Sequence, residues 1–375
     1  MKKLLFFIES LTGGGAEKVL VTLLRHLNDT KYDITLLTLV DAGPLRADVN
    51  LKRIHYQTVI RNSSNTLHSL WNKTKYKLIY HLLPIQWACK LVIPQKDFDL
   101  YIAFTEGFAT KLLAHAPGKK IAWIHTDLNN NPWPLNIGIY KDLEEEKFAY
   151  GRYDKAVCVS RVVEEVMNRY YGIHQTQTIY NLIDADYIIA QSIRPSSFSA
   201  SQGFNIVTVG RLVVQKGYDR LIPIIAKLSQ EGNNINLLII GAGPELANLK
   251  QIAHRCRVAD SISFMGYQNN PYPIMLQADL LVCSSRVEGF GLTIAEAMIL
   301  GLPVISMRCS GPEELLQGGK YGELCDDYIS LAHAIGRACS DADYLQELRK
   351  KSLAGQTCFN VKQPLQQIET LFDSI

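Results

Sequence analysis

The chain has 375 residues, which is long for a single core and sufficient for two domains of ordinary size. Hydrophobic residues make up 47% of it and charged residues 20%, as is typical of a globular protein, and the net charge of +3 gives no reason to expect a nucleic acid partner. Eight cysteines are scattered without any Cys-x-x-Cys pair, which argues against a zinc site and against a secreted disulfide framework.

The first residues, Met-Lys-Lys-Leu-Leu-Phe-Phe-Ile, imitate a signal peptide, but Glu9 ends the apolar run too early for one. No window contains eighteen uninterrupted apolar residues, so we expect no transmembrane helix. A cytoplasmic location with reduced thiols is the expectation that follows.

Charge is distributed unevenly along the chain. Residues 1–180 carry 23 Lys and Arg against 17 Asp and Glu, whereas residues 181–375 carry 16 against 19. The region from Leu51 to Lys96 contains eight basic residues and no acidic one. We therefore expect the two halves of the chain to meet different partners.

Short, continuous apolar runs predict buried strands of a parallel sheet in the first half. Leu4–Ile8 is the first, and a glycine-rich turn that includes Gly14 and Gly15 separates it from a helix with an apolar stripe from Ala16 onward. Such a turn before a helix N-terminus suits an anion, although any tight turn also needs glycine. The other strands expected in this half are Ile34–Leu39, Asp99–Phe104, Ile121–Ile124 and Ala156–Val159.

The segment Leu67–Ile93 combines apolar and basic residues. Pro84 and His81 make it a poor transmembrane helix. A helix pair that lies on anionic lipid would explain the pattern, since each Lys or Arg near such a surface contributes about 1 kcal/mol. An ordinary packed helix with a solvated lysine face is the alternative. The interleaved lysines are Lys73, Lys75, Lys77 and Lys90.

The second half repeats the alternation of short strands and helices. Arg211 and Lys216 lie on the loop that follows the predicted strand Phe204–Val209, at the sheet edge where α/β proteins gather ligands. The planar guanidinium of an arginine and the compact ammonium of a lysine can together bind a diphosphate. Further strands are expected at Asn236–Ile240, Ile262–Met265, Leu280–Cys283 and Val304–Ser306.

Two acids, Glu288 and Glu296, flank the loop and helix start after the strand Leu280–Cys283. The glycines between them can present bare backbone amides to an anion at a helix N-terminus. Carboxylates on either side can accept hydrogen bonds from sugar hydroxyls. The spacing therefore indicates a nucleotide-sugar site.

The stretch Ser285-Arg-Val-Glu-Gly-Phe-Gly-Leu-Thr-Ile-Ala-Glu-Ala resembles the E-x7-E signature of retaining glycosyltransferases of the GT-B fold, and of family four in particular. The Gly-Gly-Ala-Glu turn, the Gly210–Gly217 loop and the Gly311-Pro-Glu-Glu turn resemble other segments of that family. The resemblance implies an α/β architecture of two facing Rossmann-like parallel-sheet domains. We place these at 1–185 and 204–360, with a linker at 186–203 and a C-terminal helix at about 363–375 that packs back on the first domain.

The resemblance also implies roles for individual residues. Glu288 would hold hydroxyls of the donor sugar, Glu296 the ribose, and Arg211 with Lys216 the diphosphate. His125 resembles the family's cleft histidine, and Asp127 would order it or meet the acceptor. Catalytic roles are expected for Glu288, His125, Lys216 and Arg211. The expected donor-binding residues are Gly14, Gly15, Arg211, Lys216, Tyr267, Glu288, Gly289, Phe290, Gly291, Leu292, Thr293 and Glu296.

The expected reaction moves a hexose or N-acetylhexosamine from a nucleoside-diphosphate sugar, with a UDP-sugar favoured, to a saccharide or lipid-linked saccharide of a bacterial surface glycan. Three Asp-x-Asp triplets, at 97–99, 184–186 and 341–343, are predicted to be structural, so neither a metal nor another cofactor is expected. A peripheral contact of residues 51–96 with the anionic inner face of the membrane is also expected. A nucleotide-sugar 2-epimerase of the same fold, a dinucleotide dehydrogenase and a non-catalytic sugar-binding protein are the alternatives, of which the dehydrogenase is disfavoured by the glycine spacing.

Overall fold

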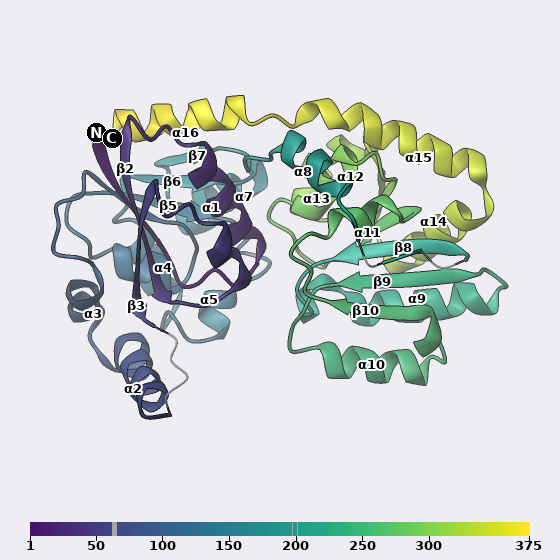
Figure 1. The fold of residues 1–375 in the computed structure, drawn as a ribbon, viewed down its shortest axis with the longest axis horizontal. Helices are drawn as coiled ribbons and strands as arrows, with labels where there is room; N and C mark the ends of the chain where they lie inside the picture. The colour runs from purple at the N-terminus through teal and green to yellow at the C-terminus, as the bar shows by residue number, and fades with distance from the viewer. Residues whose placement is uncertain (62–65, 197, 201) are drawn as a thin grey trace. The chain divides into compact units, whose positions relative to one another are not determined.

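The computed structural model describes residues 1–61, 66–196, 198–200 and 202–375, and the side chains of these residues except 66–69. The expected segment 51–96 and linker 186–203 therefore lie partly outside the described residues. The chain divides into two compact units, one of Met1–Leu182 with Lys362–Ile375 and one of Ile183–Val361. Each unit is a parallel sheet covered by helices (Figure 1).

The sheet of the first unit has seven parallel strands in the order β3-β2-β1-β4-β5-β6-β7. Its central strands are continuous buried apolar runs, which is possible only because helices cover both faces. The strands are β1 (Lys2–Ile8), β2 (Tyr32–Val40), β3 (Ile54–Ile60), β4 (Leu100–Ala103), β5 (Lys119–Ile124), β6 (Lys155–Cys158) and β7 (Thr176–Thr178). The helices are α1 (Gly15–His26), α2 (Thr66–Lys77), α3 (Ile85–Val92), α4 (Phe108–Leu113), α5 (Trp133–Asn136), α6 (Leu143–Tyr150), α7 (Arg161–Val166) and α16 (Lys362–Ser374).

The second unit has a six-stranded sheet in the order β10-β9-β8-β11-β12-β13, again all parallel. The strands are β8 (Phe204–Val209), β9 (Ile235–Ile240), β10 (Ile262–Gly266), β11 (Leu280–Cys283), β12 (Val304–Met307) and β13 (Glu323–Cys325). The helices are α8 (Ala185–Ser192), α9 (Tyr218–Gln230), α10 (Leu246–Arg255), α11 (Tyr272–Leu276), α12 (Leu292–Ile299), α13 (Ser310–Leu315), α14 (Tyr328–Ser340) and α15 (Ala342–Gly355).

Helix α16 belongs to the first unit although it ends the chain, and Figure 1 shows the N- and C-termini close together. The ring of Phe372 is fully buried and meets the rings of Phe6 and Tyr32 edge-on, at centroid distances of 6.0 and 5.9 Å. Asp373 accepts a hydrogen bond from the Tyr32 hydroxyl at 3.0 Å and pairs with Lys31 at 2.5 Å. The apolar stripe of α16 therefore completes the core of the first unit.

The expected strands are present in the structure, and the expected parallel α/β organisation is confirmed. Three strands were not predicted, namely β3, β7 and β13, and each is at the edge of its sheet. An edge strand is covered on fewer sides, so β3 and β7 are mostly half-exposed and lack a continuous apolar run. Residues 185–192, which fall almost wholly in the expected linker, instead form α8 of the second unit.

A helix pair is present in the segment 66–92, as expected. A π-helical turn, η2 (Leu78–Leu82), follows α2 directly, and Pro84 is the N-cap residue of α3. Lys75 ties α2 to the sheet, because its Nζ donates to the carbonyl of Val59 in β3 at 2.8 Å. In the described part of the chain, no helix has both the length and the hydropathy that crossing a bilayer requires.

Candidate functional site

Two loops of the second unit bring Lys216 and Glu288 together. They follow the neighbouring strands β8 and β11, so both begin at the carboxyl edge of the sheet. Lys216 Nζ lies 2.5 Å from Glu288 Oε1, and the Ser285 hydroxyl donates to the same oxygen at 2.7 Å. Burial opposes the charge on Lys216, but the Glu288 carboxylate outweighs it and raises the pKa of the lysine. With exposed fractions of 19% and 13%, the pair is held in partly desolvated surroundings.

A second ion pair fixes these two loops to each other. Arg286, two residues before Glu288, forms a bidentate pair with Asp219 at 2.8 Å for both bonds and also donates to the carbonyl of Val214. Gly217 has a φ of +69°, and a Cβ there would lie 2.0 Å from the carbonyl oxygen of Ser284. Only glycine permits both this backbone conformation and the close approach of the two loops.

The loop between the two glutamates is packed against the turn that begins α13. The backbone N–H of Gly311 donates to the carbonyl of Glu288 at 2.9 Å, and a Cβ on Gly311 would lie 2.6 Å from backbone atoms of Phe290. Gly291, the N-cap residue of α12, has a left-handed backbone with a φ of +95°. The helix start that carries Leu292 and Thr293 is therefore held in place from outside the loop.

The other predicted residues of this unit have different surroundings. Glu296 is 3% exposed and accepts a hydrogen bond from the Tyr272 hydroxyl at 3.3 Å. Arg211 lies on the loop after β8 and is exposed. Tyr267 is the residue that follows β10, and it is 39% exposed. Both loops leave the carboxyl edge of the same sheet as the Lys216–Glu288 pair.

In the first unit, Gly14 is the residue before α1 and Gly15 is its first residue. The carboxylate of Glu17 folds back over this turn, since a Cβ on Gly14 would lie 2.4 Å from Glu17 Oε2. Thr12 also donates to Glu17 at 3.2 Å. An anionic ligand at these amides would compete with a carboxylate of the chain itself. Donor binding by Gly14 and Gly15 stays a prediction.

His125 follows β5 and is held in one tautomer. Its Nε2 lies 3.0 Å from the carbonyl oxygen of Phe104, so Nε2 carries the proton and Nδ1 is the acceptor. Burial lowers the pKa of His125 to about 3, and the imidazole is neutral. The buried Glu106 accepts hydrogen bonds from the backbone N–H groups of His125 and Thr126, which fixes the loop that carries the ring.

Asp127 is fully buried, and its carboxylate caps the turn that follows it. It accepts from the backbone N–H of Asn129 and Asn130, both at 3.1 Å, and from the Asn130 side chain at 2.8 Å. Asp127 thus orders the turn that follows it. Both roles expected for Asp127, ordering of His125 and contact with an acceptor, stay predictions.

Comparison with known proteins gives matches along almost the whole chain. The family described as Glycosyltransferase Family 4 matches residues 13–187, and the family described as Glycosyl transferases group 1 matches residues 190–353. An uncharacterized glycosyltransferase of Methanocaldococcus jannaschii is 33% identical over 284 residues, which cover 72% of this chain and 68% of that protein. The chain belongs to the family-four glycosyltransferases.

Two further similarities describe this glycosyltransferase more closely. The lipopolysaccharide core biosynthesis glycosyltransferase LpsD of Rhizobium meliloti is 24% identical over 92% of this chain and 89% of its own length. The crystal structure of HepE from Anabaena, in complex with UDP and glucose, matches all of both chains with a TM-score of 0.78 at 21% identity. The two parallel-sheet units are thus those of the GT-B fold.

One aspartate of each Asp-x-Asp triplet of the glycosyltransferase has a structural contact. Asp184 and Asp341 cap the helices α8 and α15 through the backbone N–H groups of Tyr187 and Tyr344, and Asp99 accepts from the backbone N–H of Lys3. Among the residues that the structure describes, no cluster of three His, Cys, Asp or Glu could hold a metal ion.

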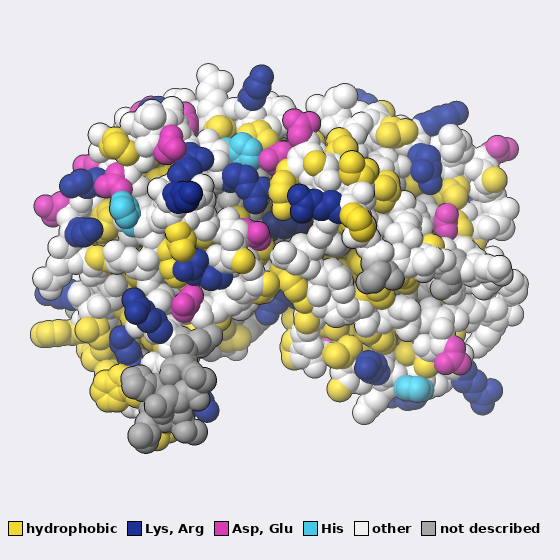
Figure 2. Space-filling model, in the orientation of Figure 1, with side chains coloured by type: hydrophobic (Ala, Val, Ile, Leu, Met, Phe, Trp, Pro, Cys, Tyr) yellow, Lys and Arg dark blue, Asp and Glu magenta, His cyan; other side chains and the backbone are white. Residues whose placement is uncertain are grey.

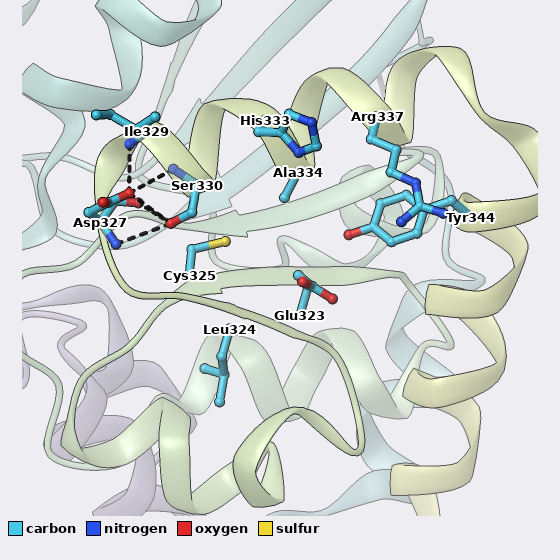
Figure 3. A pocket seen from close by; sticks show the side chains of 10 residues that line it. All are labelled: Glu323, Leu324, Cys325, Asp327, Ile329, Ser330, His333, Ala334, Arg337 and Tyr344. Atoms are coloured by element: carbon cyan, nitrogen blue, oxygen red, sulfur yellow. Dashed lines mark hydrogen bonds between the residues drawn. The ribbon is translucent and has the colours of Figure 1, made fainter.

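A hollow of about 440 Å³ in the second unit of the glycosyltransferase contains none of the predicted site residues (Figure 3). It lies between β13, α14 and α15. Asp327 caps α14 there, and the guanidinium of Arg337 stacks on the ring of Tyr344 at 4.0 Å. These side chains already have partners within the fold, so the hollow gives no second candidate site.

Sequence reasoning missed four residues that support the site of the glycosyltransferase: Glu106, Tyr272, Ser285 and Asp219. Ser285 precedes Glu288 by three residues, so a search for hydroxyls within one turn of the key acid would have found it. The other three are distant in sequence from the residues that they contact. A single sequence contains no signal for such pairings.

Proposed function

We propose that this glycosyltransferase moves a hexose or N-acetylhexosamine from a nucleoside-diphosphate sugar, with a UDP-sugar favoured, to a saccharide or lipid-linked saccharide acceptor. The product would belong to a bacterial surface glycan such as a capsule, an exopolysaccharide or an O-antigen. The observation that carries the proposal is the Lys216–Glu288 pair. It places a cation, and a carboxylate that can accept hydrogen bonds from sugar hydroxyls, beside a glycine-rich helix start. The similarity to HepE with UDP and glucose and to LpsD supports the donor and the pathway.

The leaving group is a diphosphate, so negative charge develops on it as the sugar departs. Lys216, the exposed Arg211 and the backbone amides at the start of α12 would stabilise this charge as fixed dipoles and cations. With these groups in place, the proposed reaction needs no metal ion. Lys216 would also exchange part of its contact with Glu288 for the phosphate when the donor binds.

Retention of anomeric configuration is part of the proposal. The acceptor hydroxyl would attack the face from which the diphosphate leaves, and a donor phosphate oxygen would take its proton. Glu288 would then hold sugar hydroxyls. His125, whose Nδ1 is the acceptor of its neutral ring, would accept a hydrogen bond from a hydroxyl rather than transfer a proton.

The test is a thermal-shift panel of nucleotide sugars, followed by product analysis in the presence of EDTA. A ligand at 100 times its dissociation constant adds about 2.7 kcal/mol of stability, so a UDP-sugar should raise the melting temperature clearly. We expect transfer with retained configuration and full activity in EDTA. Inhibition by EDTA, or an isomerised nucleotide sugar as the product, would overturn the mechanism, and the latter outcome would identify an epimerase.

A lipid-linked acceptor requires the enzyme to reach a membrane surface. Residues 51–96 are the part of the chain that we expect to make this peripheral contact, because they contain eight basic residues and no acidic one.

A further inference from the structure

The pair of helices α2 and α3 exposes an unusual amount of apolar surface. Trp71 and Trp87 are 66% and 65% exposed, and Leu82 in the turn between the helices is 72% exposed. Figure 2 shows hydrophobic and basic side chains side by side around these helices. We call this surface the outer face of α2–α3. Its large apolar residues are Leu70, Trp71, Leu78, Leu82, Trp87 and Leu91.

Helical spacing places these residues in stripes rather than at random. Along α2, Leu70, Lys73 and Lys77 recur at intervals of three and four residues. Trp71 of α2 and Leu78, the first residue of η2, are seven residues apart. Trp87 and Leu91 are four residues apart on α3, whereas Ala88, Cys89 and Val92 on its other side are buried. Both helices therefore present apolar residues outward, and α3 also packs apolar residues inward.

The charge of the outer face has a single sign. Lys73, Lys77 and Lys90 are exposed, and the ammonium of Lys90 lies 5.7 Å from the centre of the Trp87 ring. The sequence contains no acidic residue between Asp48 and Asp97. Each lysine stem can lie along apolar surface while its head stays in a polar layer.

The inner side of the segment is fixed to the sheet. The π-helical turn η2 directs Tyr80 inward, where its ring stacks on Phe108 at 4.3 Å and on Tyr76 at 5.0 Å. The Tyr80 hydroxyl donates to the carboxylate of Glu9, the residue after β1. Since β1 is parallel to its neighbours, Glu9 lies at their carboxyl edge, and the turn links this edge to the outer face.

We propose that the outer face of α2–α3 docks on an anionic lipid surface. Tryptophan and leucine would enter the interface between headgroups and acyl chains, and the lysines would meet the anionic headgroups. A second copy of the chain fits less well, because it would set lysine against lysine. A protein partner fits less well too, since lysine is depleted in the cores of protein interfaces.

The docking itself does not depend on the proposed transfer reaction. Only its consequence rests on that function: the acceptor would be anchored in the same lipid layer and would reach the carboxyl edge of the first sheet beside Tyr80 and Glu9. Membrane binding and catalysis can thus be measured separately.

The experiment is sedimentation of the full chain with vesicles of phosphatidylcholine alone or mixed with phosphatidylglycerol. We expect binding to the anionic vesicles that weakens as salt rises, because the Debye length falls from about 30 Å at 0.01 M to about 8 Å at 0.15 M. Each of Lys73→Gln, Lys77→Gln and Lys90→Gln should weaken partitioning about fivefold, which corresponds to about 1 kcal/mol for one cation. The double variant Trp71→Ala/Trp87→Ala should lose binding almost completely.

The matched control is Ile193→Ala/Ile329→Ala, which removes two side chains of 77% and 81% exposure from the second unit. It should bind vesicles as the wild type does. All variants should keep wild-type melting temperatures and the wild-type response to UDP-sugars, because the exchanged side chains are exposed. A failure of that nucleotide response alone would contradict the proposed function and leave the docking intact.

Three outcomes of the vesicle experiment would overturn the docking proposal: no binding to anionic vesicles, equal binding to both vesicle types, or equal binding by the tryptophan variant and the control. The docking proposal would also be contradicted if analytical ultracentrifugation showed that the wild type is a dimer and Trp71→Ala/Trp87→Ala is a monomer. That result would identify a second copy as the occupant.

Discussion

At the scale of single residues, the site depends on charges held close to one another with little solvent. Lys216 and Glu288 are each less than one-fifth exposed, and Ser285 shares the carboxylate oxygen. Removing one member of such a pair leaves the other charge without a partner, which costs more than the pair itself contributes. The residues that we propose for donor binding are therefore also residues on which local stability depends.

Lys216→Met should lower kcat by more than a hundredfold and reduce the free energy of unfolding by about 1–3 kcal/mol. The lost cation no longer stabilises the leaving diphosphate, and Glu288 remains partly buried without its partner. UDP-sugar turnover and urea unfolding measure the two effects.

The control is Lys351→Met, which breaks the more exposed Lys351–Glu347 pair on α15 and should change stability by less than about 0.5 kcal/mol. The charge swap Lys216→Glu/Glu288→Lys should recover part of the stability but no activity. Recovery of activity by the swap would contradict the roles assigned to the two residues.

The buried carboxyl of Glu106 holds the His125 loop through hydrogen bonds from the backbone N–H groups of His125 and Thr126. Burial raises its pKa from 4.5 to about 7. Between these two values the folded state binds a proton that the unfolded state lacks, so stability falls as pH rises through this window. Glu106→Gln keeps an oxygen acceptor for the N–H groups of His125 and Thr126 but cannot ionise.

We expect the melting temperature of Glu106→Gln to depend less on pH between 5 and 8 than that of the wild type. Thermal unfolding in a series of buffers measures the slope. An unchanged slope in the variant would show that the carboxyl of Glu106 does not titrate in this range.

At the scale of elements, the loops of the site are shaped by helices and turns outside them. Gly311 in the first turn of α13 packs on the backbone of Phe290, and the contact leaves no space for a Cβ. The sequence predicted the glycine turn by resemblance, but not that it serves as a support for the Glu288 loop.

Gly311→Ala should therefore displace the loop from Glu288 to Gly291 and weaken donor binding at least tenfold. Isothermal titration with UDP measures the loss. Gly151→Ala is the control, because φ there is −62° and the new methyl would meet ordinary contacts at 3.4 Å. Equal affinities of the two variants would exclude the support role.

The sequence predicted the central elements well and the edges poorly, for a physical reason. Strands such as β1 and β11 are buried on both faces and must be apolar throughout, so their composition identifies them. The edge strands β3 and β7 carry no such constraint. Likewise Lys216 and Glu288 were recognisable from family motifs, whereas Glu106 and Tyr272 act through contacts that only folding creates.

At the scale of the whole molecule, the two units differ in how they respond to pH. Three carboxyls of the first unit, those of Glu9, Glu106 and Glu146, have pKa values that burial raises to about 7. In the second unit, Asp219 has a lowered pKa because of its hydrogen bonds with Arg286, and its contribution to stability is already complete above pH 5.

Between pH 5 and 6.5 the lowered pKa of His125 acts in the opposite direction, so the prediction concerns higher pH. Raising the pH from 6.5 to 8 should destabilise the first unit and leave the second almost unchanged. Hydrogen exchange of the full chain, corrected for the intrinsic dependence on pH, should show faster exchange in β1, β4 and β5 but not in β8 or β11. Uniform acceleration in both sheets would contradict the prediction.

The return of α16 to the first unit has a consequence for biosynthesis. Residues 183–361 are contiguous and can fold as soon as the ribosome has released them, whereas the first unit lacks Phe372 until helix α16 has been translated. Phe6 and Tyr32, which are translated before the whole second unit, remain without this packing partner until then. The half that is made first is thus the half that matures last, and nascent chains stalled before residue 362 should expose its unfinished core to chaperones.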